Sequence, residues 1–169
     1  MESAHQVHPF PPLWDEHSRI LILGSFPSIK SREQRFFYGH PQNRFWPLLA
    51  RLLKEDAPRT IEEKRAMVLK HHIALWDSIA SCDIVGSSDS SIRNVVANDF
   101  TPILQGADIQ QIFTNGTKSH EIYTKYVEPK TGRKAVKLPS TSPANAAYSL
   151  DTLTQLWGEK LNPILRRNS

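Results

Sequence analysis

Cysteine is nearly absent from this sequence, and so are long apolar runs. The one cysteine, Cys82, can form no disulfide within the chain and cannot supply the thiolates of an iron–sulfur cluster or a structural zinc site. No apolar stretch approaches the ~20 residues of a membrane-spanning helix, and the first residues lack the basic-then-apolar order of a signal peptide. We therefore expect a cytoplasmic protein with no cofactor, no metal centre and no contact with a membrane.

The balance of charge is only slightly basic. With 21 Lys and Arg against 17 Asp and Glu, the formal net charge is +4. Such an excess favours a polyanionic partner, although a charge of this size is more often spread over a solvated surface. The 169 residues and the 39% apolar content predict one domain, spanning residues 1–169 and large enough for a layered core.

The N-terminal segment is polar and contains three prolines, which oppose regular structure, so we expect residues 1–17 to form an arm. His5 and His8 in this arm are of a metal-ligating type. No cysteine or carboxylate pattern accompanies them, however, and we do not predict a metal site there.

Four short apolar runs alternate with segments of helical character. This order predicts an α/β fold with crossover connections, in three layers (α/β/α) around a central four-stranded parallel sheet. The expected strands are residues 20–23, 73–77, 111–115 and 135–138, and the expected helices are residues 43–53, 60–71, 99–104, 118–127 and 150–165. Residues 29–37 and 86–91 are expected to be surface loops.

The loops that follow the four strands begin at Gly24, Asp77, Gly116 and Pro139. In a parallel sheet these loops meet at one edge, which is where open α/β sheets bind their ligands. A GxSxG sequence, a Walker loop and a GxGxxG sequence are all missing, which disfavours an acyl-transfer or nucleotide-binding protein.

Three segments in this order resemble the motifs of the uracil-DNA glycosylase superfamily: GSFPS at residues 24–28, FYGHPQNRFW at residues 37–46 and LPSTSPAN at residues 138–145. The branch that they resemble most is that of the hypoxanthine (deoxyinosine) DNA glycosylases, and the resemblance extends roughly over residues 12–157. It implies the fold of that superfamily and a DNA glycosylase that hydrolyses the N-glycosidic bond of deaminated bases in base excision repair. Hypoxanthine is the chief expected base, with uracil a further candidate. The implied partner is DNA carrying deaminated bases, bound by a monomer associated with the nucleoid.

One position departs from the superfamily pattern. Most members carry an Asp or Asn that holds the attacking water where this chain has Phe26, and an apolar ring cannot do so. The resembling branch uses the Asn of its GHPxN segment, here Asn43, as the catalytic residue. We expect the Asn43 carbonyl oxygen to orient the water while its NH2 group is anchored to the backbone. The alternative is that Asn43 only caps the helix that follows.

The resemblance also implies a set of base-binding residues. Asp77 stands where relatives read the Watson–Crick edge of the base, and its carboxylate would accept from N1–H of hypoxanthine; the alternative is a capping Asp without a ligand. The Phe26 backbone N–H would orient the base, Phe37 and Tyr38 would stack on it, and His40 is a further candidate partner.

The last motif lacks the catalytic His of the strongest uracil glycosylases, so uracil activity should be weaker. Its small residues fit a loop that contacts phosphates, with Asn145 in the space left by the flipped base. The predicted DNA-binding residues are Ser28, Ser140, Thr141, Ser142 and Asn145.

Two functions remain open at this point. A monofunctional glycosylase is favoured because the motif loops contain no lysine except Lys30, and Schiff-base chemistry needs a desolvated amine. A non-catalytic nucleic-acid-binding protein of the same fold is the alternative, and the missing acid at Phe26 supports it.

Overall fold

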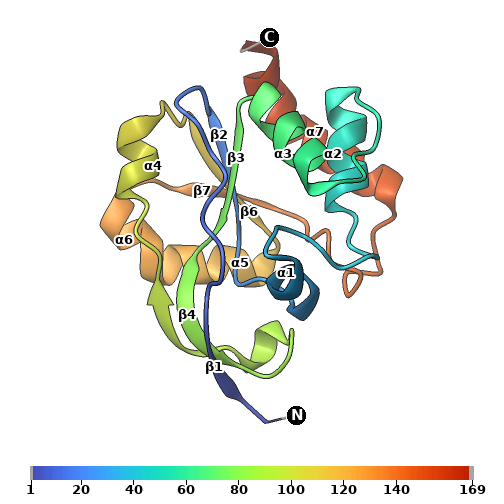
Figure 1. Cartoon of the computed structure of the whole chain (residues 1–169). Coiled ribbons are helices and arrows are strands. Elements are labelled where there is room, and N and C mark those ends of the chain that lie inside the picture. The colour runs from blue at the N-terminus through green and yellow to red at the C-terminus, as the bar shows by residue number, and fades with distance from the viewer. Residues whose placement is uncertain (1, 168–169) are drawn as a thin grey trace.

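A parallel sheet of four strands forms the centre of the computed structural model, which describes residues 2–167 (Figure 1). The strand order is β3-β2-β6-β7, and each neighbouring pair is parallel, as the alternation of strands and helices predicts. The strands are β2 (Ile20–Gly24), β3 (Ile73–Asp77), β6 (Gln111–Asn115) and β7 (Ala135–Leu138). The three-layer α/β/α fold is therefore confirmed.

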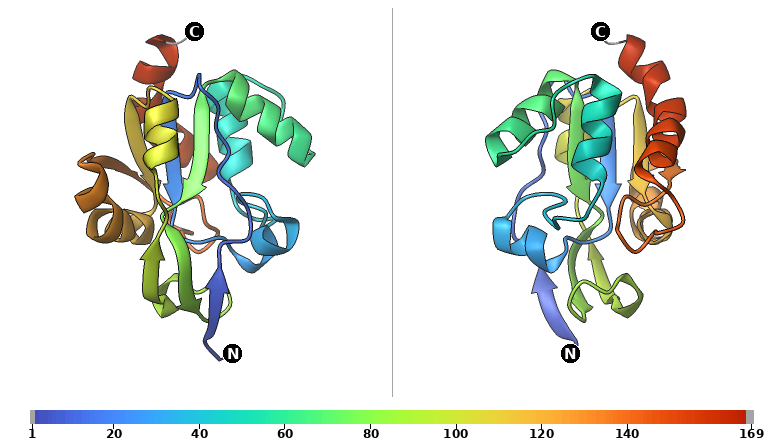
Figure 2. Two further views of the ribbon diagram at one scale, coloured as in Figure 1. Left: turned by 60° about the vertical axis from the view of Figure 1, so that its left-hand side comes forward. Right: turned by 90° about the vertical axis from the view of Figure 1, so that its right-hand side faces the viewer.

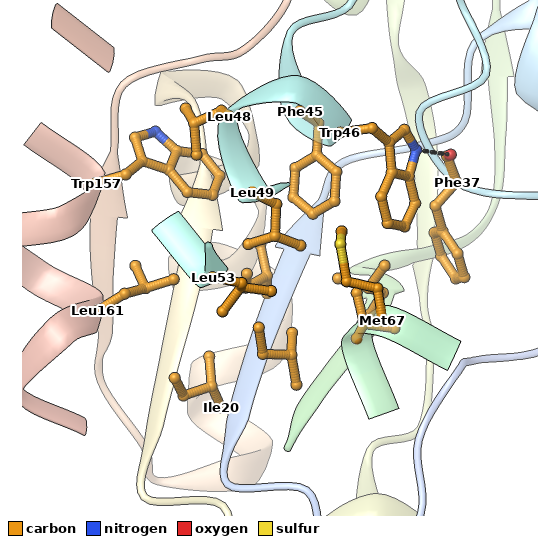
Figure 3. Packing of buried hydrophobic residues seen from close by; sticks show 14 of the residues in the cluster. Ile20, Phe37, Phe45, Trp46, Leu48, Leu49, Leu53, Met67, Trp157 and Leu161 are labelled. Atoms are coloured by element: carbon orange, nitrogen blue, oxygen red, sulfur yellow. Dashed lines mark hydrogen bonds between the residues drawn. The ribbon is translucent and has the colours of Figure 1, made fainter. Parts of the chain in front are cut away.

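One face of the sheet is covered by three helices, α2 (Phe45–Leu53), α3 (Ile61–Lys70) and α7 (Leu150–Arg167). Ile20 and Ile22 of β2 point toward this side, because alternate residues of a strand face opposite ways. Figure 3 shows how Phe45 and Trp46 of α2 pack in this cluster, with the Trp46 ring nitrogen donating to the Phe37 carbonyl oxygen at 3.0 Å. This layer fixes the start of α2 against the sheet.

The opposite face receives Leu21 and Leu23. It is covered by α4 (Thr101–Gly106) and by one continuous helical segment made of α5 (Thr117–Ile122), the π-helical turn η2 (Tyr123–Val127) and α6 (Glu128–Thr131). None of the helices within residues 2–167 is long and apolar enough to cross a membrane.

A second, antiparallel sheet extends beyond the carboxyl edge of the first and was not predicted (Figure 2). Its order is β1-β4-β5, and its strands are β1 (Ala4–Val7), β4 (Ile79–Ile84) and β5 (Arg93–Ala97). Part of the expected N-terminal arm is thus a strand. The expected loop at residues 86–91 is the tip of the β4–β5 hairpin and includes the 3-10 turn η1 (Asp89–Ser91). The outer strands β1 and β5 are largely exposed, and the buried residues of β4 do not alternate regularly, so none of the three shows the apolar run or clean alternation that marks a strand.

The segment after the first motif is a helix, α1 (Ile29–Gln34), and the prediction of a surface loop there is wrong. The Ser28 hydroxyl caps it by accepting from the Ser31 N–H at 3.2 Å, and Arg35 ends it in the left-handed conformation. Ser31 is the buried residue of this short helix. Without an apolar stripe, the sequence gives little sign of helix here.

Candidate functional site

A cavity of about 350 Å³ opens at the carboxyl edge of the parallel sheet, where the four strand-end loops were expected to meet. Its size lies within the range of sites for small ligands. Every site residue proposed from the sequence lines it, with the exception of Asn145. These lining residues are Phe26, Ser28, Phe37, Tyr38, His40, Asn43, Asp77, Ser140, Thr141 and Ser142.

The side-chain amide of Asn43 is oriented opposite to our expectation. Its Oδ1 accepts two hydrogen bonds, from the Phe45 N–H at 2.9 Å and from the Thr141 hydroxyl at 2.8 Å. An amide oxygen has two lone pairs, so this acceptor is fully used. Among residues 2–167 the NH2 group has no hydrogen-bond partner. Asn43 therefore presents donors to the cavity it lines, and its oxygen is not available to orient a water.

The Asn43 bond to Phe45 also resolves the capping alternative. Helix α2 starts at Phe45, and its N-cap residue is Arg44, which makes no side-chain capping bond. Asn43 lies one residue before the N-cap and still satisfies the first N–H of the helix. It thus combines a helix-start bond with a place on the cavity wall.

Asn115, which the sequence analysis did not single out, completes the support of Asn43. Its Oδ1 accepts from the Thr141 N–H and its Nδ2 donates to the Thr141 hydroxyl, both at 3.0 Å. The Thr141 hydroxyl then donates to Asn43, so one relay runs from Asn115 through Thr141 to Asn43. Asn115 ends the third strand of the parallel sheet, and its place at a strand end could have identified it.

Thr141 was expected to contact DNA, but it is 1% exposed and bonded within the protein. Its carbonyl oxygen accepts from the Arg44 N–H at 3.0 Å, in addition to the bonds that its N–H and hydroxyl make. No polar group of Thr141 is left for a phosphate. Its structural role is to hold the two asparagines in place.

Asp77 lies at the floor of the cavity at the end of β3 and is 5% exposed. Its Oδ2 accepts from His8 Nε2 at 2.7 Å. The Nδ1 of His8 accepts from the Phe10 N–H at 3.4 Å, so the ring proton is on Nε2 and points at Asp77. We did not foresee this contact, because it depends on the pairing of β1 with β4, for which the sequence carries no clear signal.

The second oxygen of Asp77 lies close to Gly24 and Tyr38. A Cβ atom built on Gly24 would be 2.5 Å from Asp77 Oδ1 and 3.6 Å from the Tyr38 hydroxyl, so only glycine leaves room for this arrangement. The Tyr38 hydroxyl is buried and makes no hydrogen bond of good geometry among the described residues, although the Asn115 side chain lies close enough to act on its pKa in the lowering direction. Burial first, and then the charge of Asp77, raise the pKa of Tyr38, which keeps the hydroxyl protonated. Asp77 Oδ1 is thus the acceptor that the cavity floor presents.

The aromatic residues of the site are mostly engaged in packing. Phe26 is 8% exposed and packs against the second sheet, with the Arg32 guanidinium 5.6 Å from the centre of its ring. Phe37 is buried edge-to-face against Phe10, and the Tyr38 ring stacks on Phe45 at 4.0 Å. All three predicted aromatic residues line the cavity, but the structure shares them with the core.

His40 is half-buried on the cavity wall, and its Nδ1 accepts from the Gln42 N–H at 3.1 Å. That bond places a proton on Nε2 in the neutral ring. The His40 side chain therefore retains a donor, which keeps it a candidate partner of a bound base.

The loop of the last motif is held by Arg44. Its guanidinium donates to the carbonyl oxygens of Ser142 at 2.8 Å and Asn145 at 2.9 Å, and also to that of Tyr148. Asn145 does not line the cavity, because its Nδ2 turns back to donate to the Ser140 carbonyl oxygen at 3.0 Å. The loop is thus preorganised by a residue of the second motif.

A groove of about 620 Å³ adjoins the cavity, and Asn145 lies there. The two share several residues on their walls, Asp89 and Asn115 among them. Lys118 also lines the groove, so an amine does stand near the site although it lies outside the quoted motifs. Within residues 2–167 no group of three His, Cys, Asp or Glu side chains is placed to hold a metal ion.

The three-layer α/β/α fold, with polar side chains enclosed by the loops at the strand ends, matches the architecture of a known superfamily of proteins. The chain belongs to the uracil DNA glycosylase superfamily, whose family model matches residues 11–164. The resemblance seen in the three motifs is thereby confirmed.

Individual relatives narrow the comparison further. A hypoxanthine DNA glycosylase of Methanosarcina acetivorans is 37% identical over 142 residues, which cover 83% of this chain and 89% of the relative. One of Methanosarcina barkeri is 37% identical over 114 residues, covering 66% and 72% respectively. A solution NMR structure from Methanosarcina acetivorans, described as a candidate uracil DNA glycosylase, matches with a TM-score of 0.77 and 32% identity. That match covers 94% of this chain and 96% of the other.

Proposed function

We propose that this protein is a monofunctional DNA glycosylase that releases hypoxanthine from deoxyinosine in DNA, as a step of base excision repair. The broader class, a DNA glycosylase, follows from the family and from two relatives that bear the name hypoxanthine DNA glycosylase. The choice of hypoxanthine for this chain is our own inference. It has support beyond the names of relatives in the hydrogen-bonding groups of the cavity floor.

The observation that carries the proposal is the Asp77 carboxylate at the cavity floor, whose Oδ1 lies beside Gly24. Hypoxanthine presents an N1–H donor next to its C6 carbonyl acceptor. Asp77 Oδ1, which has no hydrogen-bond partner among the described residues, can accept from N1–H. Adenine offers the reverse pattern, an acceptor at N1 and an amino donor, so it would leave the carboxylate facing a lone pair. The floor thus favours a deaminated purine over its parent base.

Uracil presents the same donor and acceptor pair at N3–H and C4=O, so the floor alone does not exclude it. The Asn43 NH2 group is a donor that can stabilise negative charge on the departing base, in the manner of an oxyanion hole. The last motif has no histidine that could further stabilise the departing base. The release of a base that is a poorer leaving group would therefore be accelerated less. We therefore rank uracil below hypoxanthine.

The test is incubation of the protein with oligonucleotides that carry one inosine, uracil, xanthine or adenine, with the released base detected by chromatography and abasic sites by alkaline cleavage. We expect release from the inosine substrate that is much slower in Asn43→Ala. Binding of the inosine duplex with no release from any substrate would instead identify a non-catalytic binder. Release of uracil but not hypoxanthine would refute the substrate assignment alone.

A further inference from the structure

A second carboxylate, that of Asp89, stands at the mouth of the cavity. Asp89 opens the turn η1 at the tip of the β4–β5 hairpin, far in sequence from the three motifs. Its Oδ1 accepts from the Ser25 hydroxyl at 3.1 Å, which fastens the hairpin tip to the first motif. Asp89 lines both the cavity and the adjoining groove, so it lies where the two meet.

The hydrolysis needs a proton acceptor near the sugar, and a carboxylate is the strongest such acceptor among the side chains that line the cavity. In the proposed binding mode, a base held by Asp77, which is 5% exposed, would direct its glycosidic bond toward the opening, away from that carboxylate. The Asn43 oxygen already accepts two hydrogen bonds, and Phe26 is apolar. Among the described residues that line the cavity, Asp77 and Asp89 are the acidic ones, and Asp89 is the one at the mouth.

We propose that Asp89 is the catalytic carboxylate that holds the attacking water, so that the β4–β5 hairpin supplies in space the acid that the first motif lacks at Phe26. This inference rests on the proposed function. The water oxygen forms a bond to C1′ while the C1′–N9 bond breaks and its electron pair leaves with hypoxanthine. The proton lost by the water passes to Asp89 and then to solvent, and the departed base takes up a proton from solvent.

The surroundings of Asp89 suit a proton acceptor. Although the residue as a whole is exposed on its hairpin, burial of the carboxylate raises the pKa of Asp89, and the charge of Asp77 adds to this. The Ser25 hydrogen bond and the charge of Lys118 act in the opposite direction without cancelling the rise. A carboxylate with a raised pKa takes a proton from water more readily than an ordinary one.

The predicted pH dependence follows from this role. Asp89 must be ionised to act, so the rate should fall as the pH drops through its pKa, at a higher pH than for an ordinary carboxylate. The other titratable groups on the cavity wall are Asp77, His40 and Tyr38. Those on the groove wall are Lys118, Lys137, Tyr148, Glu159 and Lys160, and of these the charge of Lys118 acts on Asp89. The acid limb is assigned to Asp89 only if it disappears when Asp89 alone is changed.

The test is Asp89→Asn, measured by single-turnover release of hypoxanthine from an inosine duplex together with the Kd for the same duplex. An asparagine keeps an oxygen that can accept from Ser25, so the hairpin should stay folded, which the melting temperature checks. We expect a rate loss of at least ~100-fold, the typical contribution of a general base. Binding should be unchanged or tighter, because one negative charge beside the DNA is removed.

Asp108→Asn is the charge-matched control. Asp108 lies before β6 and is exposed outside both the cavity and the groove, so the variant should release hypoxanthine at the wild-type rate. In Asp89→Asn the acid limb of the rate profile should disappear from the residual activity. A near-wild-type rate in Asp89→Asn, a retained acid limb, or a loss of binding that matches the loss of rate would each overturn the role of Asp89. If the wild-type protein releases no base at all, the proposed function fails first, and this inference with it.

Discussion

The Thr141 hydroxyl donates to Asn43 Oδ1 at 2.8 Å and so joins the last motif of the chain to the second. Asn115 donates to the same hydroxyl at 3.0 Å, which directs the hydroxyl proton toward Asn43. Together with the Phe45 N–H, this relay fixes the Asn43 amide with its oxygen inward and its NH2 group free. The amide is thus set up as a donor before any substrate binds.

Substitutions of Asn43 distinguish a donor from an acceptor role. Asn43→Asp keeps an oxygen for Phe45 and Thr141 but removes the NH2 donors, so it should be as defective as Asn43→Ala. We expect a loss of about 100-fold or more in single-turnover release of hypoxanthine, as for removal of an oxyanion-hole donor. An Asn43→Asp enzyme close to wild type would mean that the residue orients a water after all.

Thr141 offers a test of the relay itself. Thr141→Val removes the hydroxyl and leaves the Asn115 NH2 group and the Asn43 oxygen each short of a partner. The unfolding free energy should fall by about 1–3 kcal/mol, the cost of buried polar groups left unpaired. A less well aligned Asn43 amide should stabilise the transition state by about 1.4 kcal/mol less, which corresponds to a rate about tenfold lower. Thr141→Ser retains the hydroxyl and should restore both quantities, measured by denaturant unfolding and by single-turnover release.

His8, which directly follows β1, should hold the Asp77 carboxylate in position. His8→Ala removes the 2.7 Å bond to a carboxylate and should lower the unfolding free energy by about 2 kcal/mol, since the bond is buried and involves a charged group. With Oδ2 unpartnered, Asp77 should also bind the base less well. Weaker inosine binding in a filter or anisotropy assay would report this.

The matched control for His8 is His5→Ala on β1. His5 also contacts a carboxylate, that of Asp83 at 3.1 Å, but its side chain is 62% exposed. An exposed pair of this kind contributes little to stability. His5→Ala should therefore leave both unfolding and inosine binding unchanged, and equal effects of the two variants would contradict the assigned role of His8.

The parallel sheet was predictable because it depends on local sequence, and most of the named cavity residues were predictable because they belong to the three resembling motifs. Ile20 to Leu23 form a buried apolar run, and such runs alternating with helical segments leave little choice of topology. The strand ends then locate Asp77 and the motif loops at one edge without any knowledge of side-chain packing. Asn115 also stands at the end of a parallel strand, so the same rule identifies it, although the sequence analysis did not single it out.

The parts that were not predictable depend on contacts between distant segments. His8 reaches Asp77 only because β1 pairs with β4, and Asp89 reaches Ser25 only because the hairpin tip folds back. The orientation of the Asn43 amide is set by Thr141, 98 residues further along the chain. No pattern of composition or spacing reports such long-range hydrogen bonds, so the expected direction of that amide was reversed.

Lys118 is one of three lysines that line the groove beside the site, together with Lys137 and Lys160. If Lys118 does not act as a nucleophile, base release should leave an abasic site whose strand stays intact until alkali is added. Incubation with sodium borohydride should then trap no covalent protein–DNA adduct, because no Schiff base forms. Lys118 lines the groove and not the cavity, although its charge reaches Asp89. A trapped adduct that persists in Lys118→Ala would point to another amine, whereas one that disappears would make the enzyme bifunctional with Lys118 as its nucleophile.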